Sequence, residues 1–158
     1  EGHPNSGFHA YSDPPPLRHR VFSAIASHPF RVDATILTKK RAYQQVRTSN
    51  LRFWKTNWYY HLRHVAPRVA TKQDELMGVS ASIETKMSPA DVRSALTDVV
   101  EQVAPCQNRH AHVWPAHADL GLQLADYCSW AIARKREQGK TDYYDLIKGK
   151  IKSEYVLF

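Results

Sequence analysis

The sequence lacks the features that mark several large protein classes. It has only two cysteines, Cys106 and Cys128, which lie 22 residues apart and share no CxxC spacing, so it offers neither a secreted disulfide framework nor a zinc knuckle. No run of 18 apolar residues exists, which excludes a transmembrane helix. The first 13 residues are polar and have no apolar segment of the kind that a secretory signal contains. These absences predict a cytoplasmic protein with no membrane partner.

Several catalytic motifs are also absent. The chain contains no P-loop, no GxGxxG loop, no GxSxG elbow and no HExxH helix. Each motif supplies a specific chemistry, such as phosphate binding by backbone amides or zinc binding by two histidines one helical turn apart. The sequence therefore gives no support to the enzyme classes that depend on these four motifs.

The composition is that of a globular protein with an excess of positive charge. Of the 158 residues, 42% are hydrophobic, enough for a sizeable core in one domain covering residues 1–158. There are 22 Lys and Arg against 15 Asp and Glu, a net charge of +7. Such a balance favours acidic partners, of which nucleic acid is the commonest. The cluster Lys39, Lys40 and Arg41 is the predicted phosphate contact, and a solvated face is its alternative.

Hydrophobic periodicity predicts an α/β fold. Apolar residues recur at helical spacing in five segments and alternate with polar residues in others. Asp13 is expected to cap the first helix, and Ser88 to cap the third. Helices are predicted over residues 14–28, 51–69, 88–104, 119–135 and 141–151, and strands over 30–37, 77–85 and 110–114. Strands that alternate with helices imply crossover connections and a largely parallel sheet with flanking helices.

One helix carries carboxylates in an apolar setting. Asp126 is the only charged residue between Leu120 and Ala133. Asp119 lies seven residues earlier, nearly two helical turns, so both lie on one stripe with Gln123 between them. In a structural interpretation Asp119 is an N-cap and Asp126 pairs with an Arg or a backbone group. In a functional interpretation the two share a divalent cation, Mg²⁺ or Mn²⁺.

Histidines and aromatic residues leave further alternatives open. His110 and His112 lie on one face of a predicted strand and could ligate zinc or manganese, or be ordinary surface residues. His9 could be a ligand, a proton shuttle or a loop residue. The run over residues 52–63 mixes aromatic and basic residues, as surfaces that grip single strands do. Its alternative is a helix with an aromatic core face and a wet basic face.

The sequence resembles the domain of unknown function 3800 family. The similarity lies in three stretches. They are Phe8-His-Ala-Tyr-Ser-Asp13 with Arg18, the motif Asp119-Leu-Gly-Leu-Gln-Leu-Ala-Asp126 with its apolar helix ending in Arg134-Lys135, and the tail over residues 141–154. Weaker similarity at residues 58–62 and 81–86 extends it over almost the whole chain.

The resemblance implies a ribonuclease H-like fold. It implies catalytic and metal-binding roles for Asp13, Asp119 and Asp126, a metal-binding role for His9 and a supporting role for Gln123. The family usually opens with a strand carrying Asp-Glu-Ser-Gly, which this sequence lacks. We therefore expect either the C-terminal portion of a longer domain or a domain that has lost this strand, with no nuclease activity on its own. The implied function is a divalent-metal-dependent nuclease, and the alternative is a non-catalytic module that binds nucleic acid or protein.

Overall fold

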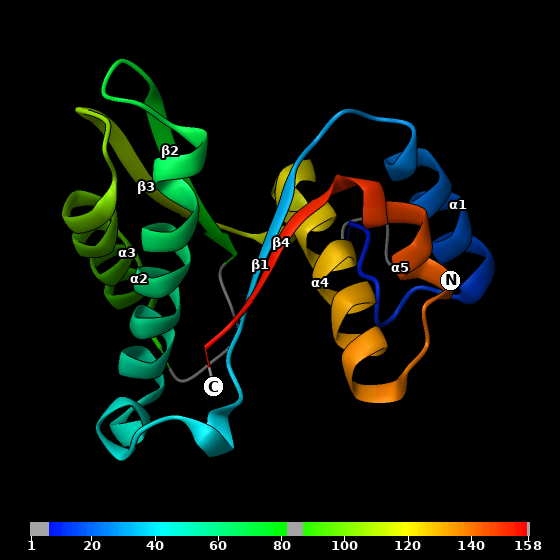
Figure 1. Ribbon diagram of the computed structural model, residues 1–158, viewed down its shortest axis with the longest axis horizontal. Coiled ribbons are helices and arrows are strands. Elements are labelled where there is room, and N and C mark those ends of the chain that lie inside the picture. The colour runs from blue at the N-terminus through cyan, green and yellow to red at the C-terminus, as the bar shows by residue number, and fades with distance from the viewer. Residues whose placement is uncertain (1–6, 82–86, 158) are drawn as a thin grey trace. The chain divides into compact units, whose positions relative to one another are not determined.

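The computed structural model describes residues 7–81 and 87–157 (Figure 1). These residues form helices and strands in alternation, with four short 3-10 turns. The elements in chain order are α1 Pro15–Ala26, β1 Val32–Ile36, η1 Lys39–Arg41, η2 Gln44–Thr48, α2 Asn50–Val69, β2 Glu75–Ala81, α3 Pro89–Val103, β3 Asn108–Trp114, η3 Ala116–Ala118, α4 Leu120–Gln138, α5 Asp142–Ile147, η4 Lys148–Lys150 and β4 Ile151–Val156. No helix in the described part of the chain is long and apolar enough to cross a membrane.

The strands form two parallel pairs. β2 pairs with β3, and Met77, Val79 and Ala81 lie opposite His110, His112 and Trp114. β1 pairs with β4. There, Ser153 Oγ donates to Asp33 Oδ1 at 2.6 Å, and the Leu157 amide donates to the Ile36 carbonyl at 3.0 Å. The contacts advance together along both strands, as they do in a parallel pair. The mixed α/β class and the parallel pairing are thus as predicted, although the described strands form two small sheets.

The chain divides into two compact units. Unit 1 comprises residues 1–34 and 116–154, and unit 2 comprises residues 35–115 and 155–158. Each unit has its own cluster of buried apolar side chains. The expected candidate carboxylates all lie in unit 1, and the expected basic cluster lies in unit 2.

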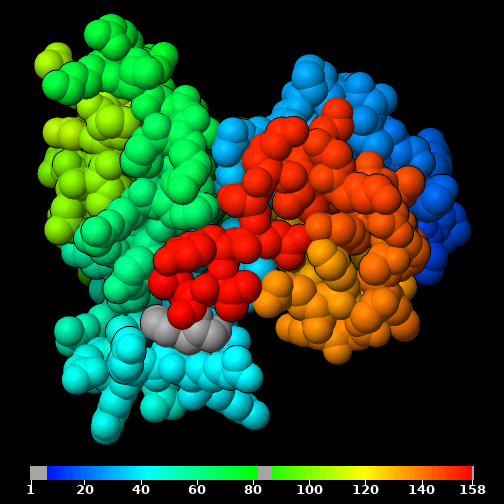
Figure 2. Space-filling view, in the orientation of Figure 1, coloured from blue at the N-terminus to red at the C-terminus, as the bar shows by residue number. Residues whose placement is uncertain are grey.

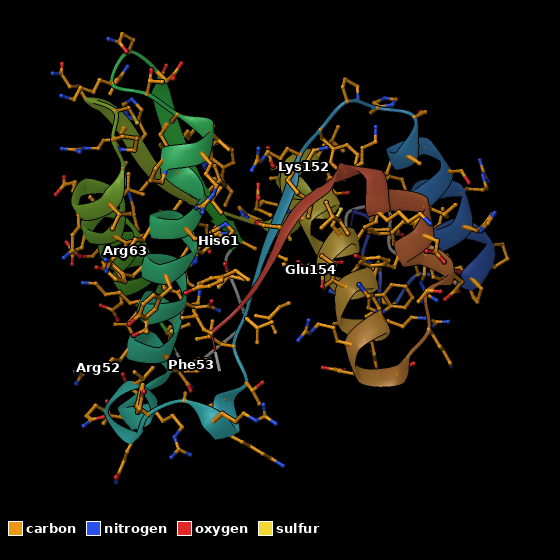
Figure 3. All side chains as sticks on the ribbon, in the orientation of Figure 1. Arg52, Phe53, His61, Arg63, Lys152 and Glu154 are labelled. Carbon is orange, nitrogen blue, oxygen red and sulfur yellow. The ribbon has the colours of Figure 1, made fainter. Side chains whose placement is uncertain are left out.

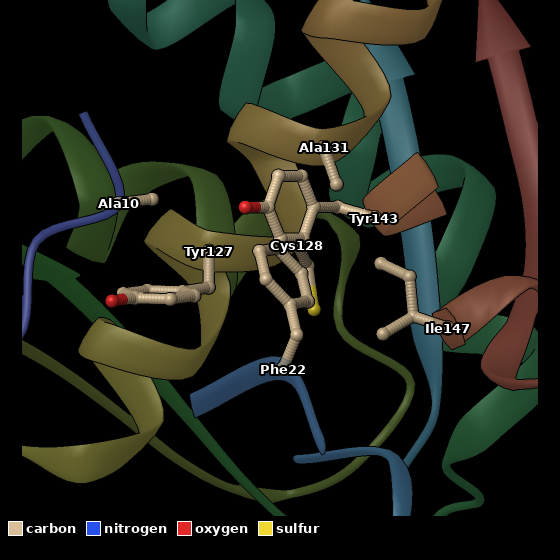
Figure 4. Packing of buried hydrophobic residues seen from close by; sticks show 7 residues of the cluster. All are labelled: Ala10, Phe22, Tyr127, Cys128, Ala131, Tyr143 and Ile147. Carbon is tan, nitrogen blue, oxygen red and sulfur yellow. The ribbon is translucent and has the colours of Figure 1, made fainter. Parts of the chain in front are cut away.

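Unit 1 is built around aromatic side chains from three helices. Phe22 of α1, Tyr127 of α4 and Tyr143 of α5 are buried together (Figure 4), and the Phe22 ring lies 5.1 Å from Tyr127 and 4.8 Å from Tyr143, centroid to centroid. Ile147 and Ala10 are fully buried in the same cluster. Aromatic pairs at such separations stabilise a core beyond the area they bury. The loop that carries Ala10 is therefore part of the core of unit 1.

In unit 2, α3 packs on the β2–β3 sheet and α2 packs on α3. Leu96, Val99 and Val100 of α3 are buried with Leu62 of α2. Gly78 of β2 lets α3 approach closely, because a Cβ there would lie 3.3 Å from the Val100 side chain. Partly buried Trp54 and Trp58 pack against this cluster. The aromatic residues of the basic run therefore include core residues, in agreement with the structural alternative.

The helix boundaries confirm most of the sequence expectations and correct two. The Ser88 hydroxyl caps α3 by accepting from the Asp91 amide at 3.1 Å. Asp13 is not the cap of α1, because Pro14 occupies that position without a side-chain bond. The last predicted helix ends at Ile147, and Ile151 begins strand β4 instead. The C-terminal end of the strand predicted over residues 77–85 lies partly outside the described residues.

Candidate functional site

Three successive backbone amides of the loop before α1 have side-chain acceptors, and two of these acceptors lie on α4. The Phe8 amide donates to Gln123 Oε1 at 2.8 Å, and the Ala10 amide donates to Asp126 Oδ2 at 2.9 Å. Between them, the His9 amide donates to Asp13 Oδ2 at 2.9 Å. Backbone amides that no helix or sheet satisfies need such partners when they are withdrawn from water. Residues 8–13, which we name the docked loop, therefore owe their conformation to these three side chains.

Arg18 secures the same loop through its carbonyl groups. Its Nε donates to the Ala10 carbonyl at 2.7 Å, and its Nη2 donates to the Asp13 carbonyl at 2.7 Å. The guanidinium lies 4.4 Å from the centre of the Trp130 ring, where a cation is attracted by the ring face. Arg18 thus links α1, the docked loop and α4.

The predicted ligands Asp13, Asp119 and Asp126 each have a structural contact. Asp119 is the N-cap of α4, and its Oδ1 accepts from the Leu122 amide at 2.8 Å. Asp126 holds the Ala10 amide, and Asp13 accepts from the His9 amide and from the Tyr127 hydroxyl. These contacts are those that the structural interpretation expects for Asp119 and Asp126. They show why carboxylates are tolerated along an apolar helix.

Three of the predicted site residues lie close together. His9 Nδ1 is 3.7 Å from Asp126 Oδ2, with side-chain exposures of 55% and 39%. His9 is also bonded through its amide to Asp13. Gln123 is buried, and its amide nitrogen donates to the carbonyls of His117 and Asp119 at 3.3 and 3.4 Å. Within the described residues, no group of three or more His, Cys, Asp and Glu side chains has the arrangement of a metal site. Metal binding at this cluster stays a prediction.

Tyr127 is the buried neutral donor of this cluster. Burial raises the pKa of its hydroxyl far above the usual value, and the hydrogen bond to Asp13 adds to the effect. A phenol that keeps its proton can donate to a carboxylate at any physiological pH. Tyr127 thus fixes the Asp13 side chain at the end of the docked loop, a role that the sequence patterns did not reveal.

The predicted basic cluster lies at the surface of unit 2. Lys39, Lys40 and Arg41 form the turn η1, and all three are exposed. Lys39 Nζ lies 5.7 Å from the centre of the Phe53 ring on α2. This contact ties the turn to the start of the long basic helix, so the cluster continues onto α2.

The cluster belongs to a larger feature that the sequence analysis missed. Residues 34–73 contain no Asp or Glu, and we name them the acid-free segment. The segment spans η1, η2 and α2, and Figure 2 shows its first part (cyan) at the molecular surface. Counting acidic residues in a sliding window would have revealed it. It holds nine basic residues, of which all but Lys55 are exposed: Lys39, Lys40, Arg41, Arg47, Arg52, Lys55, Arg63, Arg68 and Lys72.

The net charge of the protein resides almost entirely in unit 2. Unit 2 has 12 Lys and Arg against 6 Asp and Glu, a net +6, whereas unit 1 has 10 against 9, a net +1. Within the acid-free segment, Lys55 is paired with an acid from outside it, Asp98 of α3, at 2.7 Å. Figure 3 shows Arg52 and Arg63 on α2. Unit 2 therefore presents a surface suited to a polyanion.

Comparison with known proteins yields no relative. No family model matches the chain, and neither a curated protein nor a solved structure does. The resemblance to the domain of unknown function 3800 family therefore rests on the quoted motifs alone. Two of these motifs meet in the structure, because Phe8 and Ala10 of one are bound by Gln123 and Asp126 of the other.

Proposed function

We propose that this protein binds nucleic acid, with the acid-free segment of unit 2 as its phosphate-contacting surface. The observation that carries the proposal is the concentration of charge. Eight exposed cations lie in a 40-residue segment without one acidic residue. Charge dispersed for solubility alone is ordinarily mixed in sign. Exposed cations concentrated in this way attract polyanions and release their counterions on binding.

The resemblance agrees with this proposal at the level of substrate. We propose that the chain has a ribonuclease H-like fold, and the resemblance implies that a domain of this fold acts on or binds nucleic acid. The structural contacts of Asp13, Asp119 and Asp126 favour the non-catalytic alternative among the functions considered. Fold-level analogy alone carries little weight for function, so the charged surface is the stronger support.

The test measures how salt changes binding. Fluorescence anisotropy with labelled DNA and RNA of about 20 nucleotides would give the affinity at several salt concentrations between about 25 and 200 mM, a range that includes physiological salt. The variant Lys39→Ala/Lys40→Ala/Arg41→Ala should bind more weakly. Its slope of log K against log salt should fall by about 2, since each phosphate contact contributes about 0.7–0.9.

A matched variant controls for net charge. Arg20, Lys140 and Lys148 are exposed cations of unit 1, and changing all three to Ala removes the same charge from the other unit. This control should leave the slope within about 0.5 of the parent value. Equal losses in both triple variants, or no binding to any nucleic acid at the lowest salt, would refute the proposal.

Metal-dependent phosphodiester cleavage is the second candidate. The proximity of His9, Asp13 and Asp126 favours it, because a histidine and two carboxylates offer the N and O ligands that Mn²⁺ and Mg²⁺ accept. In such a reaction bound cations would activate water and stabilise the leaving oxygen. The carboxylates already have partners in the docked loop, which places this candidate second.

A further inference from the structure

Three aromatic rings stand in a row on strand β3. His110, His112 and Trp114 occupy alternate positions, so their side chains lie on one face of the sheet. The ring planes of His110 and His112 differ by 17° with centroids 6.4 Å apart, and those of His112 and Trp114 differ by 23° with centroids 5.3 Å apart. We name these three residues the ring ladder. Such ordered, near-parallel rings are the geometry on which other planar groups stack.

The ring ladder lies on the face of the sheet opposite the helices of unit 2. Gly78 faces α3, as its closeness to Val100 and Leu96 shows, and its register partner is Ala111. Side chains one position away point to the other face. That face carries the ring ladder together with its register partners Met77, Val79 and Ala81. The end of this face that carries Met77 and His110 is open to solvent, since Met77 is 54% exposed and the His110 side chain is 47% exposed.

The acid-free segment leads directly to this end of the sheet. It ends at Gln73, two residues before β2 begins at Glu75. Arg68 and Lys72, seven and three residues before β2, are both exposed. Glu75 is paired with His110 Nε2 at 3.2 Å, so this acid is already engaged on the ladder side. Exposed cations therefore precede this end of the aromatic face in the sequence.

We propose that the ring ladder stacks the bases of single-stranded nucleic acid while the acid-free segment holds its phosphates. The proposal rests on the function proposed above and narrows its substrate to unpaired strands. The ring centroids lie 6.4 and 5.3 Å apart, and the bases of an unpaired strand can adjust their spacing to these rings. A duplex cannot, because its bases already stack on one another.

The test compares strands and ring variants. Anisotropy would measure binding of a labelled dT oligonucleotide and of a duplex of equal length, both at about pH 8. The parent protein should prefer the single strand by about tenfold or more. The variant His112→Ala should lose about five- to a hundredfold in single-strand affinity, with little change for the duplex. The variant His112→Phe should retain single-strand affinity because it keeps a ring.

The control is a ring removed from unit 1. Tyr11 is 80% exposed, and Tyr11→Ala should change neither affinity. A loss in His112→Ala that His112→Phe fails to restore would overturn the stacking role, as would equal parent affinity for both nucleic acids. In those cases the triple Lys39/Lys40/Arg41 variant still reports on the phosphate surface, so the broader proposal is judged separately. Concentration-dependent dimers that vanish in His112→Ala would show that a second copy of the chain covers this face, and would also overturn the inference.

Discussion

Replacing Gln123 by Leu should destabilise unit 1 by releasing the docked loop. Gln123 is 6% exposed and makes three hydrogen bonds, one from the Phe8 amide and two to the carbonyls of His117 and Asp119. Each typical hydrogen bond contributes about 0.5–1.5 kcal/mol net, and a partner left unpaired in a buried place costs more. Leucine has a similar volume and regains part of this by apolar burial. We expect a net loss of about 2–3 kcal/mol in the free energy of unfolding.

The assay is urea unfolding together with amide hydrogen exchange. For a protein of this length, the expected loss lowers Tm by about 4–12 °C. The Phe8 amide should exchange markedly faster in the variant, because its acceptor is gone. Gln102 is an exposed glutamine on α3, and the matched change Gln102→Leu should shift stability by less than about 0.5 kcal/mol. Equal stabilities of the two variants, with Phe8 exchange unchanged, would refute the role assigned to Gln123.

Three further outcomes are expected. Ser88→Ala should cost about 1 kcal/mol of unfolding free energy by removing the cap of α3, measurable by urea unfolding. Burial opposes ionisation of Glu154, but hydrogen bonds from Tyr144 and Lys135 outweigh it and lower its pKa below 4.5. Its contribution to stability is therefore complete above pH 4.5 and declines as pH falls through the lowered pKa, and Glu154→Gln should flatten this acid limb. Burial raises the pKa of the Cys128 thiol to about 11, so folded protein at pH 8 should resist alkylation there, as mass spectrometry can show.

The sequence predicted the elements well because local signals and packing agree. Ser88-Pro89 marks the start of α3, and alternation marks β1. The strand β4 was missed because Ile147 and Ile151 are four residues apart, a helical spacing, whereas 3-10 turn η4 separates them in the structure. Strand pairing and the division into two units depend on contacts distant in sequence, which periodicity does not encode.

The candidate site was predictable in its members and only partly in their roles. The stripe Asp119, Gln123 and Asp126 follows from helical geometry, and the capping role of Asp119 was one of the two alternatives. The partners of Gln123 and Asp126 lie more than 100 residues earlier in the chain, in the docked loop. No spacing rule connects positions so far apart. The sequence therefore identified the two motifs separately but did not predict the contact between them.

The same contacts argue that the chain alone should not cleave nucleic acid. A pair of catalytic cations needs several carboxylate oxygens that converge on it. Here Asp119 Oδ1 caps α4, Asp126 Oδ2 holds the Ala10 amide, and Asp13 Oδ2 accepts from His9 and Tyr127. Within the described residues these carboxylates do not converge in the arrangement of a metal site, so we expect no cleavage of labelled DNA or RNA in Mg²⁺ or Mn²⁺. Cleavage that Asp126→Asn abolishes, while Tm changes by less than about 2 °C, would contradict this argument and establish the carboxylates as a metal site. Cleavage that persists unchanged in Asp126→Asn would place any activity away from these carboxylates.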